Sequence, residues 1–278
     1  MTLEAEGLCV RRSGRALLQN LSLSLAAGEV LAVVGANGAG KSTLLRVLSA
    51  ELTPDRGQVR LNGRALADWP ARESAKRRAV LPQHSPLDFP FTALEVVLMG
   101  RIPHGGPGAE DVHRAALALA EVGLAPLAER RYTTLSGGER QRVHLARVLV
   151  QIWEPLPAQE PRFLLLDEPT ASLDLAHQHA TLALAQRWAQ HDLGVLIVLH
   201  DLNLAAQYAN RVAVLKAGQL LAVGAPAKVL EPTLIAEAFG LPVQILPHPE
   251  LPCPLIVARA QPAPAANQSA TQARVPIA

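Results

Sequence analysis

Nine consecutive residues have the composition of a loop that binds phosphate groups: Gly35, Ala36, Asn37, Gly38, Ala39, Gly40, Lys41, Ser42 and Thr43. The glycines let the backbone wrap closely round phosphates and turn its N–H groups inward. The helix predicted to begin near Lys41 adds its positive end, while Lys41 reaches the β- and γ-phosphates and Ser42 ligates Mg²⁺. A plain Gly-rich turn is the alternative. A buried strand before the loop and a Leu-rich helix after it favour binding of ATP and Mg²⁺.

A second element rich in glycine suggests another phosphate-binding surface. It consists of Leu135, Ser136, Gly137, Gly138 and Glu139, and it runs into a basic stretch. A serine and two glycines at the start of a helix expected over 139–151 leave backbone N–H groups free to bind an anion. Ser136 as a plain helix N-cap is the other interpretation. Whether both surfaces meet on one nucleotide is open at this point.

Polar side chains follow other apolar runs of the chain. Asp167 and Glu168 follow one such run, where an Asp can hold Mg²⁺ and a Glu can orient or deprotonate an attacking water. A turn or helix-cap carboxylate is the alternative, which the phosphate loop in the same chain makes the weaker one. His200 ends another run and is placed for a γ-phosphate contact, although a lone histidine is more often structural. Gln83, after Val80-Leu81-Pro82, could by itself be any loop glutamine.

Buried parallel strands are the elements that must position these residues. The near-continuous apolar runs 30–34, 163–166 and 195–199 are typical of strands covered on both faces. Ligands collect at the carboxyl ends of such strands. Antiparallel hairpins are expected over 58–65, around Asn62-Gly63, and over 211–223. A helical segment is expected over 91–151, with an apolar stripe at Val112, Ala115, Ala116 and Leu119.

Composition and net charge limit the classes of protein to which this chain can belong. The 278 residues are 49% hydrophobic but only 3% aromatic, so the core must be aliphatic. A net charge of +2 argues against nucleic acid as a partner. No secretory signal and no transmembrane run are expected, and Cys9 and Cys253 are expected to stay reduced. From about Arg259 onward Pro, Ala, Gln and Ser predict a disordered tail over 259–278.

Together these motifs resemble the nucleotide-binding subunit of an ATP-binding-cassette (ABC) transporter, over roughly Leu3 to Val257. The matching pieces appear in the family's order. Residues 35–42 are similar to the Walker A loop, Gln83 is similar to the Q-loop glutamine, and 135–139 are similar to the signature motif. Residues 163–167 are similar to Walker B, Glu168 to the catalytic glutamate, 172–174 to the D-loop, and His200 to the switch histidine.

The resemblance implies an α/β fold of the P-loop NTPase class. A mostly parallel core sheet, an antiparallel β subdomain and an inserted helical subdomain at about 91–151 would make up one nucleotide-binding domain over 1–258. It also implies an ATPase in which Glu168, His200 and Gln83 act in hydrolysis, and Ser42, Gln83 and Asp167 hold Mg²⁺.

The resemblance further implies a homodimer with two ATP molecules at its interface. Ser136, Gly137, Gly138 and Glu139 of one chain would then cap the nucleotide held by the other, and Asp174 would lie at the dimer interface. Two transmembrane permease subunits and, indirectly, a periplasmic haem-binding protein would complete an importer. The chain would lie peripherally on the cytoplasmic face of the inner membrane.

A narrower likeness concerns the cargo. The stretch 91–104 is similar to the importers of ferric siderophores, haem and cobalamin, and 151–161, 173–178 and the closing Leu246-Pro247-His248-Pro249 resemble the haem importer ATPases most closely. Ferric siderophore or cobalamin as cargo, or a soluble non-transport ABC ATPase, are the alternatives. The histidines His104, His177, His179 and His248 are interpreted as solvated side chains rather than haem or metal ligands.

The sequence departs from the family pattern at one place. The family usually has an aromatic residue that stacks on adenine, and the stretch 9–14 has none. An apolar contact from Val10 or the guanidinium plane of Arg11 could substitute for it, with looser selectivity for the base.

Overall fold

A six-stranded sheet forms the centre of the molecule in the computed structural model, which describes residues 1–83, 87–106, 108–156, 160–171 and 173–259. Its strand order is β10-β9-β3-β8-β7-β6, with β10 antiparallel to β9 and all other neighbours parallel. The strands are β3 (Val30–Val34), β6 (Arg78–Leu81), β7 (Arg162–Asp167), β8 (Leu193–Val198), β9 (Arg211–Lys216) and β10 (Gln219–Gly224). Every residue of β3, β7 and β8 is buried, which confirms the strands predicted from continuous apolar runs.

Alternate residues of β3 point into two separate hydrophobic cores. Val30, Ala32 and Val34 belong to the core that the sheet shares with the helices, including α5. Leu31 and Val33 belong to the core between this sheet and the antiparallel sheet. Successive side chains of a strand point to opposite faces, so a strand covered on both sides has to be apolar throughout.

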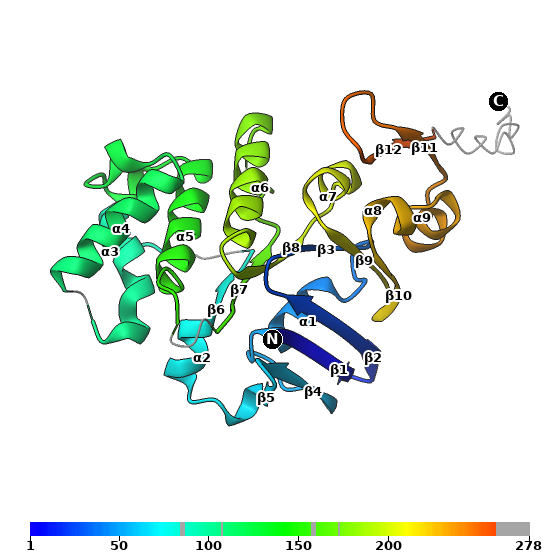
Figure 1. The fold of residues 1–278 in the computed structure, drawn as a ribbon, viewed down its shortest axis with the longest axis horizontal. Helices are drawn as coiled ribbons and strands as arrows, with labels where there is room; N and C mark the ends of the chain where they lie inside the picture. The colour runs from blue at the N-terminus through cyan, green and yellow to red at the C-terminus, as the bar shows by residue number, and fades with distance from the viewer. Residues whose placement is uncertain (84–86, 107, 157–159, 172, 260–278) are drawn as a thin grey trace, which may run out of the picture.

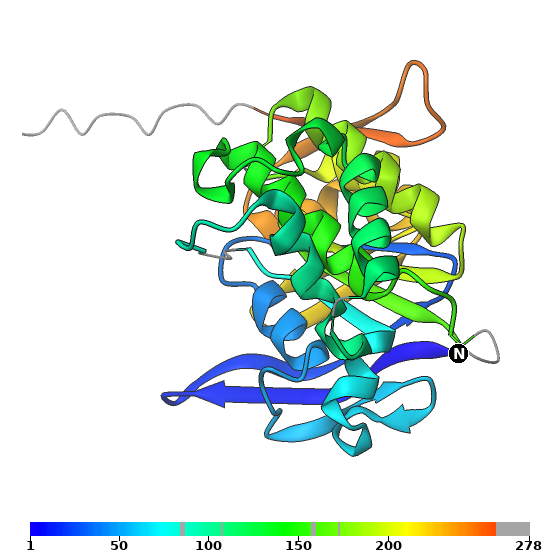
Figure 2. The same cartoon turned by 90° about the vertical axis from the view of Figure 1, so that its left-hand side faces the viewer.

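A four-stranded antiparallel sheet covers one face of the central sheet, and α1 (Lys41–Leu48) packs into the core between them (Figures 1 and 2). Its order is β2-β1-β4-β5, formed by β1 (Thr2–Arg12), β2 (Arg15–Ala26), β4 (Arg56–Leu61) and β5 (Arg64–Ala65). Asn62 and Gly63, which join β4 to β5, have φ angles of 52° and 81°. Positive φ at both positions is the geometry of the predicted two-residue hairpin turn.

Helices α3, α4 and α5 form a lobe at one end of the central sheet, next to β6 (Figure 1). This lobe is the helical segment predicted over 91–151. Besides α1, the helical elements in the described ranges are η1 (Leu66–Asp68), α2 (Ala71–Arg77), α3 (Ala93–Leu98), η2 (Met99–His104), α4 (Ala109–Glu121), η3 (Ala125–Leu127), η4 (Tyr132–Thr134), α5 (Gly137–Gln151), α6 (Leu175–Ala189), α7 (Leu202–Tyr208), α8 (Pro226–Val229) and α9 (Pro232–Phe239).

The apolar stripe predicted for α4 is wrong in two of its four positions. Val112 and Ala116 are exposed, whereas the buried side chains of this helix are Asp111, Ala115, Ala118 and Leu119. Asp111 faces inward because its carboxylate accepts a hydrogen bond from the buried Arg101 at 2.8 Å. The ion pair places the charged Asp111, instead of Val112, on the inner face of the helix. A pattern of apolar residues cannot predict this orientation, because it does not include ion pairs.

The described part of the chain ends in a separate two-stranded sheet, β11 (Val243–Pro247) paired with β12 (Pro254–Ala258), which lies beside α7 and α9. Apart from Arg259, the tail predicted over 259–278 lies outside the described residues. None of the helices in the described ranges has the length and apolar character needed to span a membrane.

Candidate active site

The residues of the phosphate loop together with Gln83, Asp167, Glu168 and His200 lie at one end of the central sheet, because each follows or ends a parallel strand at its carboxyl end. From β3 outward, the strand order places the phosphate loop after β3, His200 after β8, Asp167 and Glu168 at the end of β7, and Gln83 after β6. Residues far apart in the sequence therefore become neighbours. Glu168 lies between His200 and Gln83 because its strand lies between theirs.

Glu168 is hydrogen-bonded on both carboxylate oxygens. Gln83 Nε2 donates to its Oε2 at 2.7 Å, and its Oε1 lies 2.5 Å from His200 Nε2. The side chain of Glu168 is 13% exposed, whereas that of His200 is 48% exposed, so the cluster opens to solvent on the His200 side. Glu168 also has a φ of 50°, in the left-handed region that non-glycine residues rarely adopt. Strain of this kind is typical of functional positions.

The phosphate loop has the backbone geometry that its glycines predict. Gly35 and Gly40 have φ angles of 157° and 105°, and a Cβ atom there would lie 2.4 Å from Leu215 O and 2.8 Å from Leu17 O, respectively. Side chains are therefore excluded at both positions, by clash and by backbone conformation. Gly40 is the N-cap of α1, so the positive end of this helix points at the loop.

Lys41 is folded onto the loop that precedes it. Its Nζ atom donates to Gly35 O at 2.7 Å and to Ala36 O at 3.2 Å, and only 6% of the residue is exposed. Burial lowers the pKa of Lys41, and the negative charges of Glu168 and Asp167 partly offset that effect. These two carbonyl oxygens are neutral acceptors, so the ammonium group of Lys41 can exchange them for phosphate oxygens, which are charged and form stronger hydrogen bonds.

Asp167 presents a buried carboxylate oxygen that has no hydrogen-bond partner among the described residues. Burial raises the pKa of Asp167, the adjacent charge of Glu168 raises it further, and a hydrogen bond from Ser42 acts in the opposite direction. A buried, unpaired carboxylate oxygen is costly unless a cation meets it. The chemistry of this donor set, a carboxylate beside a hydroxyl next to a phosphate loop, fits Mg²⁺, which binds proteins through few side chains plus substrate phosphates.

The second glycine-rich element starts α5 and faces outward. Ser136 is its N-cap and forms a capping box: Glu139 N donates to Ser136 Oγ at 3.3 Å, and Ser136 N donates to Glu139 Oε2 at 2.7 Å. The backbone N–H of Ser136 holds the pKa of Glu139 below its usual range. Within the described residues, no hydrogen bond or ion pair joins Ser136–Glu139 to the loop of Lys41.

Asp174 is likewise a helix N-cap at the surface. Its Oδ1 accepts from His177 N at 2.9 Å and lies 2.7 Å from His177 Nδ1. The hydrogen bond from the backbone of His177 lowers the pKa of Asp174, and the His177 side chain adds to it. Ser172, the first residue of the same motif, lies outside the described residues.

Val10 is not available for a contact with adenine. It is fully buried in the core between the sheets and paired with Leu18 of β2. A strand alternates between its two faces, so Val10 points inward while Arg11 lies on the exposed side. Of the two residues considered for this contact, only Arg11 can reach a ligand.

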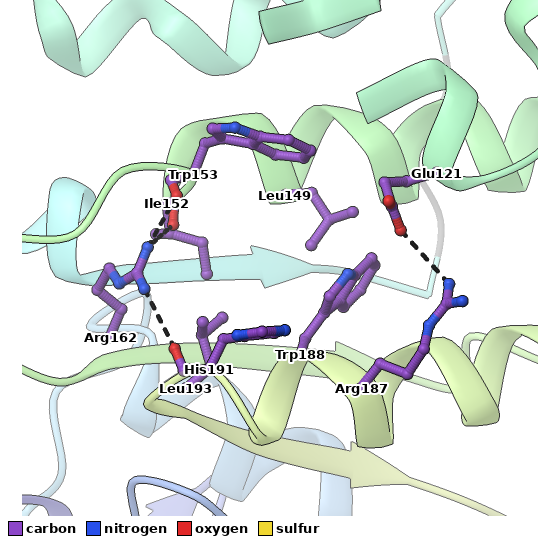
Figure 3. Close-up of a pocket in the computed structure, with 9 residues that line it drawn as sticks. All are labelled: Glu121, Leu149, Ile152, Trp153, Arg162, Arg187, Trp188, His191 and Leu193. Carbon is purple, nitrogen blue, oxygen red and sulfur yellow. Dashed lines mark hydrogen bonds and ion pairs between the residues drawn. The ribbon is translucent and has the colours of Figure 1, made fainter. Parts of the chain in front are cut away.

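The cavity shown in Figure 3, about 380 Å³, lies away from this site. It is lined by Glu121, Leu149, Ile152, Trp153, Arg162, Arg187, Trp188, His191 and Leu193. Arg162 and Leu193 are the first residues of β7 and β8, so the cavity opens at the opposite edge of the sheet from Glu168. Arg162 donates to carbonyl oxygens at the ends of α5 and α6, namely Ile152 O at 2.6 Å and His191 O at 3.3 Å. This arrangement holds two helix ends together and has no part in the phosphate site.

One residue beside the site carries no signal in the sequence. Asn203, three positions after His200, hydrogen-bonds to the backbone of Ile256 in β12. Because its partner is a main-chain group that the fold brings close, no motif or spacing marks Asn203 in advance.

The sequence profile of the ABC transporter family matches residues 18–171. A hemin import ATP-binding protein of Gloeobacter violaceus is 60% identical over 257 residues, covering 92% of this chain and 93% of that protein. One from Myxococcus xanthus is 55% identical and covers 92% and 97%, respectively. Among solved structures, an inward-facing metal-chelate type ABC transporter superposes with a TM-score of 0.78 at 30% identity, covering 93% of this chain and 97% of that chain. A nucleotide-free ATP-binding cassette from an ABC transporter gives 0.71 at 25% identity, covering 81% and 92%.

Proposed function

This chain belongs to the ABC transporter family, and we propose that it is the ATP-hydrolysing subunit of a hemin importer. The observation that carries the proposal is the position of Glu168 at the end of β7, between His200 and Gln83 and beside the loop that holds Lys41. The names of its relatives support hemin as the cargo. An ATPase subunit need not touch the cargo, so the described residues do not themselves identify it.

We propose the following roles in hydrolysis. The loop from Gly35 to Thr43 holds the phosphates of ATP, and Lys41 exchanges its carbonyl partners for the β- and γ-phosphates. Ser42, Gln83 and Asp167 would hold Mg²⁺, which when bound supplies neutralisation of phosphate charge.

Glu168 is proposed as the base and His200 as the γ-phosphate contact. Each oxygen of Glu168 accepts one hydrogen bond and keeps a second lone pair, with which the carboxylate can accept a proton from water. His200, exposed at the rim, is placed to turn toward the γ-phosphate as it leaves Glu168. A bound nucleotide can therefore change the hydrogen bonding of Glu168 by drawing His200 toward the γ-phosphate.

We further propose that the chain works as a homodimer. Ser136–Glu139 presents a helix N-terminus to solvent, and Gly137 has open space where a side chain would lie. Such a surface suits a phosphate held by a second copy, with Asp174, also exposed, at the interface.

The permease is proposed to dock on the surface around η2. Ile102 of η2 is 70% exposed, and Phe89 (65%) and Phe91 (36%) are exposed in the segment that precedes α3. Exposed apolar side chains next to a hollow suit a protein partner, and a hollow of about 500 Å³ beside Ile102 is lined by Arg72, Pro103, Gly105 and Gly106. Two transmembrane permease subunits, and through them a periplasmic hemin-binding protein, would complete the importer and hold this chain at the cytoplasmic face of the inner membrane.

Replacing Glu168 with Gln tests the hydrolytic role. The variant is expected to bind ATP with unchanged affinity and to lose nearly all turnover, since an amide cannot accept the proton. Unchanged turnover would remove Glu168 from the role of base.

Uptake into liposomes tests the cargo. The subunit, reconstituted with its permease and periplasmic binding protein, is expected to drive ATP-dependent uptake of hemin in preference to a ferric siderophore or cobalamin. Equal uptake of all three would contradict the hemin assignment. Stable association with ribosomes instead of a permease would contradict transport altogether.

A further inference from the structure

The side chain of Asn203 joins the C-terminal hairpin to the body of the protein. Its Nδ2 donates to Ile256 O at 3.1 Å, and Ile256 N donates to its Oδ1 at 2.8 Å. The N–H and C=O of one strand residue point to the same side, so the amide pairs with β12 as the backbone of a neighbouring strand would. The pairing uses the edge of β12 that faces away from β11.

Asn203 lies in the first turn of α7, immediately after the catalytic cluster. Asp201, the N-cap, accepts from Asn203 N at 2.7 Å and from Leu204 N at 3.1 Å. His200 precedes the cap and contacts Glu168 at 2.5 Å. A single turn, capped by Asp201, therefore connects the hairpin to His200.

Leu204, Ala205 and Ala206 pack the middle of α7 into the core, and side-chain hydrogen bonds hold its two ends. The helix has only seven residues, so hydrogen bonding within it does little to fix its direction. At its far end Gln186 Nε2 donates to Tyr208 O at 3.0 Å, and His179 Nδ1 lies 2.7 Å from the Tyr208 hydroxyl. At its near end, the pairing of Asn203 with Ile256 holds the turn that carries His200.

We propose that Asn203 is a positioning residue for ATP hydrolysis, fixing through α7 the direction from which His200 meets Glu168. The C-terminal hairpin, β11 and β12, thereby supports the active site. The proposal rests on the proposed function, because it assigns no role to Asn203 apart from His200 and Glu168.

The first test replaces Asn203 with Leu, which has nearly the same shape but cannot hydrogen-bond. Turnover is expected to fall about ten- to a hundredfold, with the KM for ATP within about twofold, because misplacing a catalytic group by about an ångström has such an effect. Asn203→Asp keeps the acceptor for Ile256 N and is expected to recover part of the loss. Gln186→Leu, which removes the side-chain contact at the other end of α7, is the matched control and is expected to keep its turnover.

A double-mutant cycle separates positioning from a general loss of structure. In the His200→Ala background, Asn203→Leu is expected to cause no further loss of turnover, because the ring it positions is absent. An equal fold-loss in both backgrounds, or an equal loss in Gln186→Leu, would overturn the proposal.

A spectroscopic measurement gives a readout without turnover. In protein labelled with ¹⁵N at histidine, the Nε2 resonance of His200, assigned with the His200→Ala variant, is expected to shift in Asn203→Leu and to stay unchanged in Gln186→Leu. An unchanged resonance in Asn203→Leu would overturn the proposal. If Glu168→Gln keeps full turnover, the proposed function fails; if it loses turnover while Asn203→Leu does not, only the present inference fails.

Discussion

Arg101 and Glu154 form a two-fold hydrogen-bonded ion pair, with Arg101 Nη1 2.7 Å from Glu154 Oε2 and Nη2 2.6 Å from Oε1. Arg101 lies in η2, next to the exposed Ile102, and Glu154 lies in the segment that leads to β7. Asp111 of α4 bonds the same guanidinium at 2.8 Å. The surface proposed to meet the permease is therefore tied by one buried cation to α4 and to the chain that follows α5.

Replacing Arg101 with Ala is expected to lower the free energy of unfolding by about 2–4 kcal/mol, because it removes the buried guanidinium that joins Asp111, Glu154 and Val150 O. Arg101 is 2% exposed, whereas Arg114, which also pairs with both carboxylates, is partly exposed and limits the loss. Denaturation by urea measures the effect. Arg187→Ala is the matched control: its ion pair with Glu121 is exposed and 3.4 Å long, and its loss should change stability by less than about 1 kcal/mol. Equal effects of the two variants would contradict a structural role for the buried pair.

Mixing two inactive variants tests the homodimer. Ser136→Arg blocks the outward-facing helix start, and Lys41→Ala disables the phosphate loop; each alone is expected to hydrolyse ATP poorly. If each site combines one chain's loop with the other chain's helix start, a mixed dimer holds one intact site. An equimolar mixture should then recover about a quarter of the wild-type sites, assuming random pairing. A mixture no more active than its components would indicate that each chain completes its own site.

The sequence predicts the site better than it predicts the packing around it. The carboxyl ends of buried strands are marked by apolar runs that stop at polar residues, so these runs alone are enough to place His200 and Glu168 at one sheet edge. The inward turn of Asp111 could not be predicted, because an ion pair between side chains ten residues apart overrides the apolar periodicity of its helix. The contact of Asn203 could not be predicted either, since its partner is a backbone group 53 residues away. Contacts that the tertiary fold creates leave no local pattern.

The pKa of Asp167 gives a prediction with a definite sign. Because burial raises this pKa, the folded state binds the proton more tightly than the unfolded state, so stability falls as pH rises from the ordinary value of 3.8 through the raised one. At neutral pH, Asp167→Asn is therefore expected to stabilise the protein by about 1–3 kcal/mol. The substitution also removes the attraction between Asp167 and Lys41, so the gain in stability is expected near the lower end of this range. Thermal unfolding of both proteins without nucleotide or Mg²⁺ from pH 4 to 8 measures this difference in stability, which is expected to grow as the pH rises.

The same variant should lose hydrolysis of ATP with Mg²⁺, since Asp167 is the one acidic side chain among the three proposed ligands and an amide at that position carries no negative charge. Stability and activity would thus change in opposite directions at one residue. A destabilised Asp167→Asn would show that the unpaired oxygen is satisfied in solution, and retained hydrolysis with Mg²⁺ would contradict the interpretation of this oxygen as a metal ligand.

Gly40 and Gly38 offer a matched pair for testing the phosphate loop. Both have positive φ, 105° and 78°, but a Cβ on Gly40 would lie 2.8 Å from Leu17 O, whereas on Gly38 it would meet nothing within 4 Å. Gly38→Ala is expected to cost about 1–2 kcal/mol from backbone strain alone. Gly40→Ala adds a clash with backbone that cannot move aside, so it should cost more and should also abolish ATP binding by displacing the start of α1 beneath Lys41. Unfolding curves and binding of a fluorescent ATP analogue measure both effects. Equal losses in the two variants would mean that the close approach of Gly40 to Leu17 does not constrain the loop.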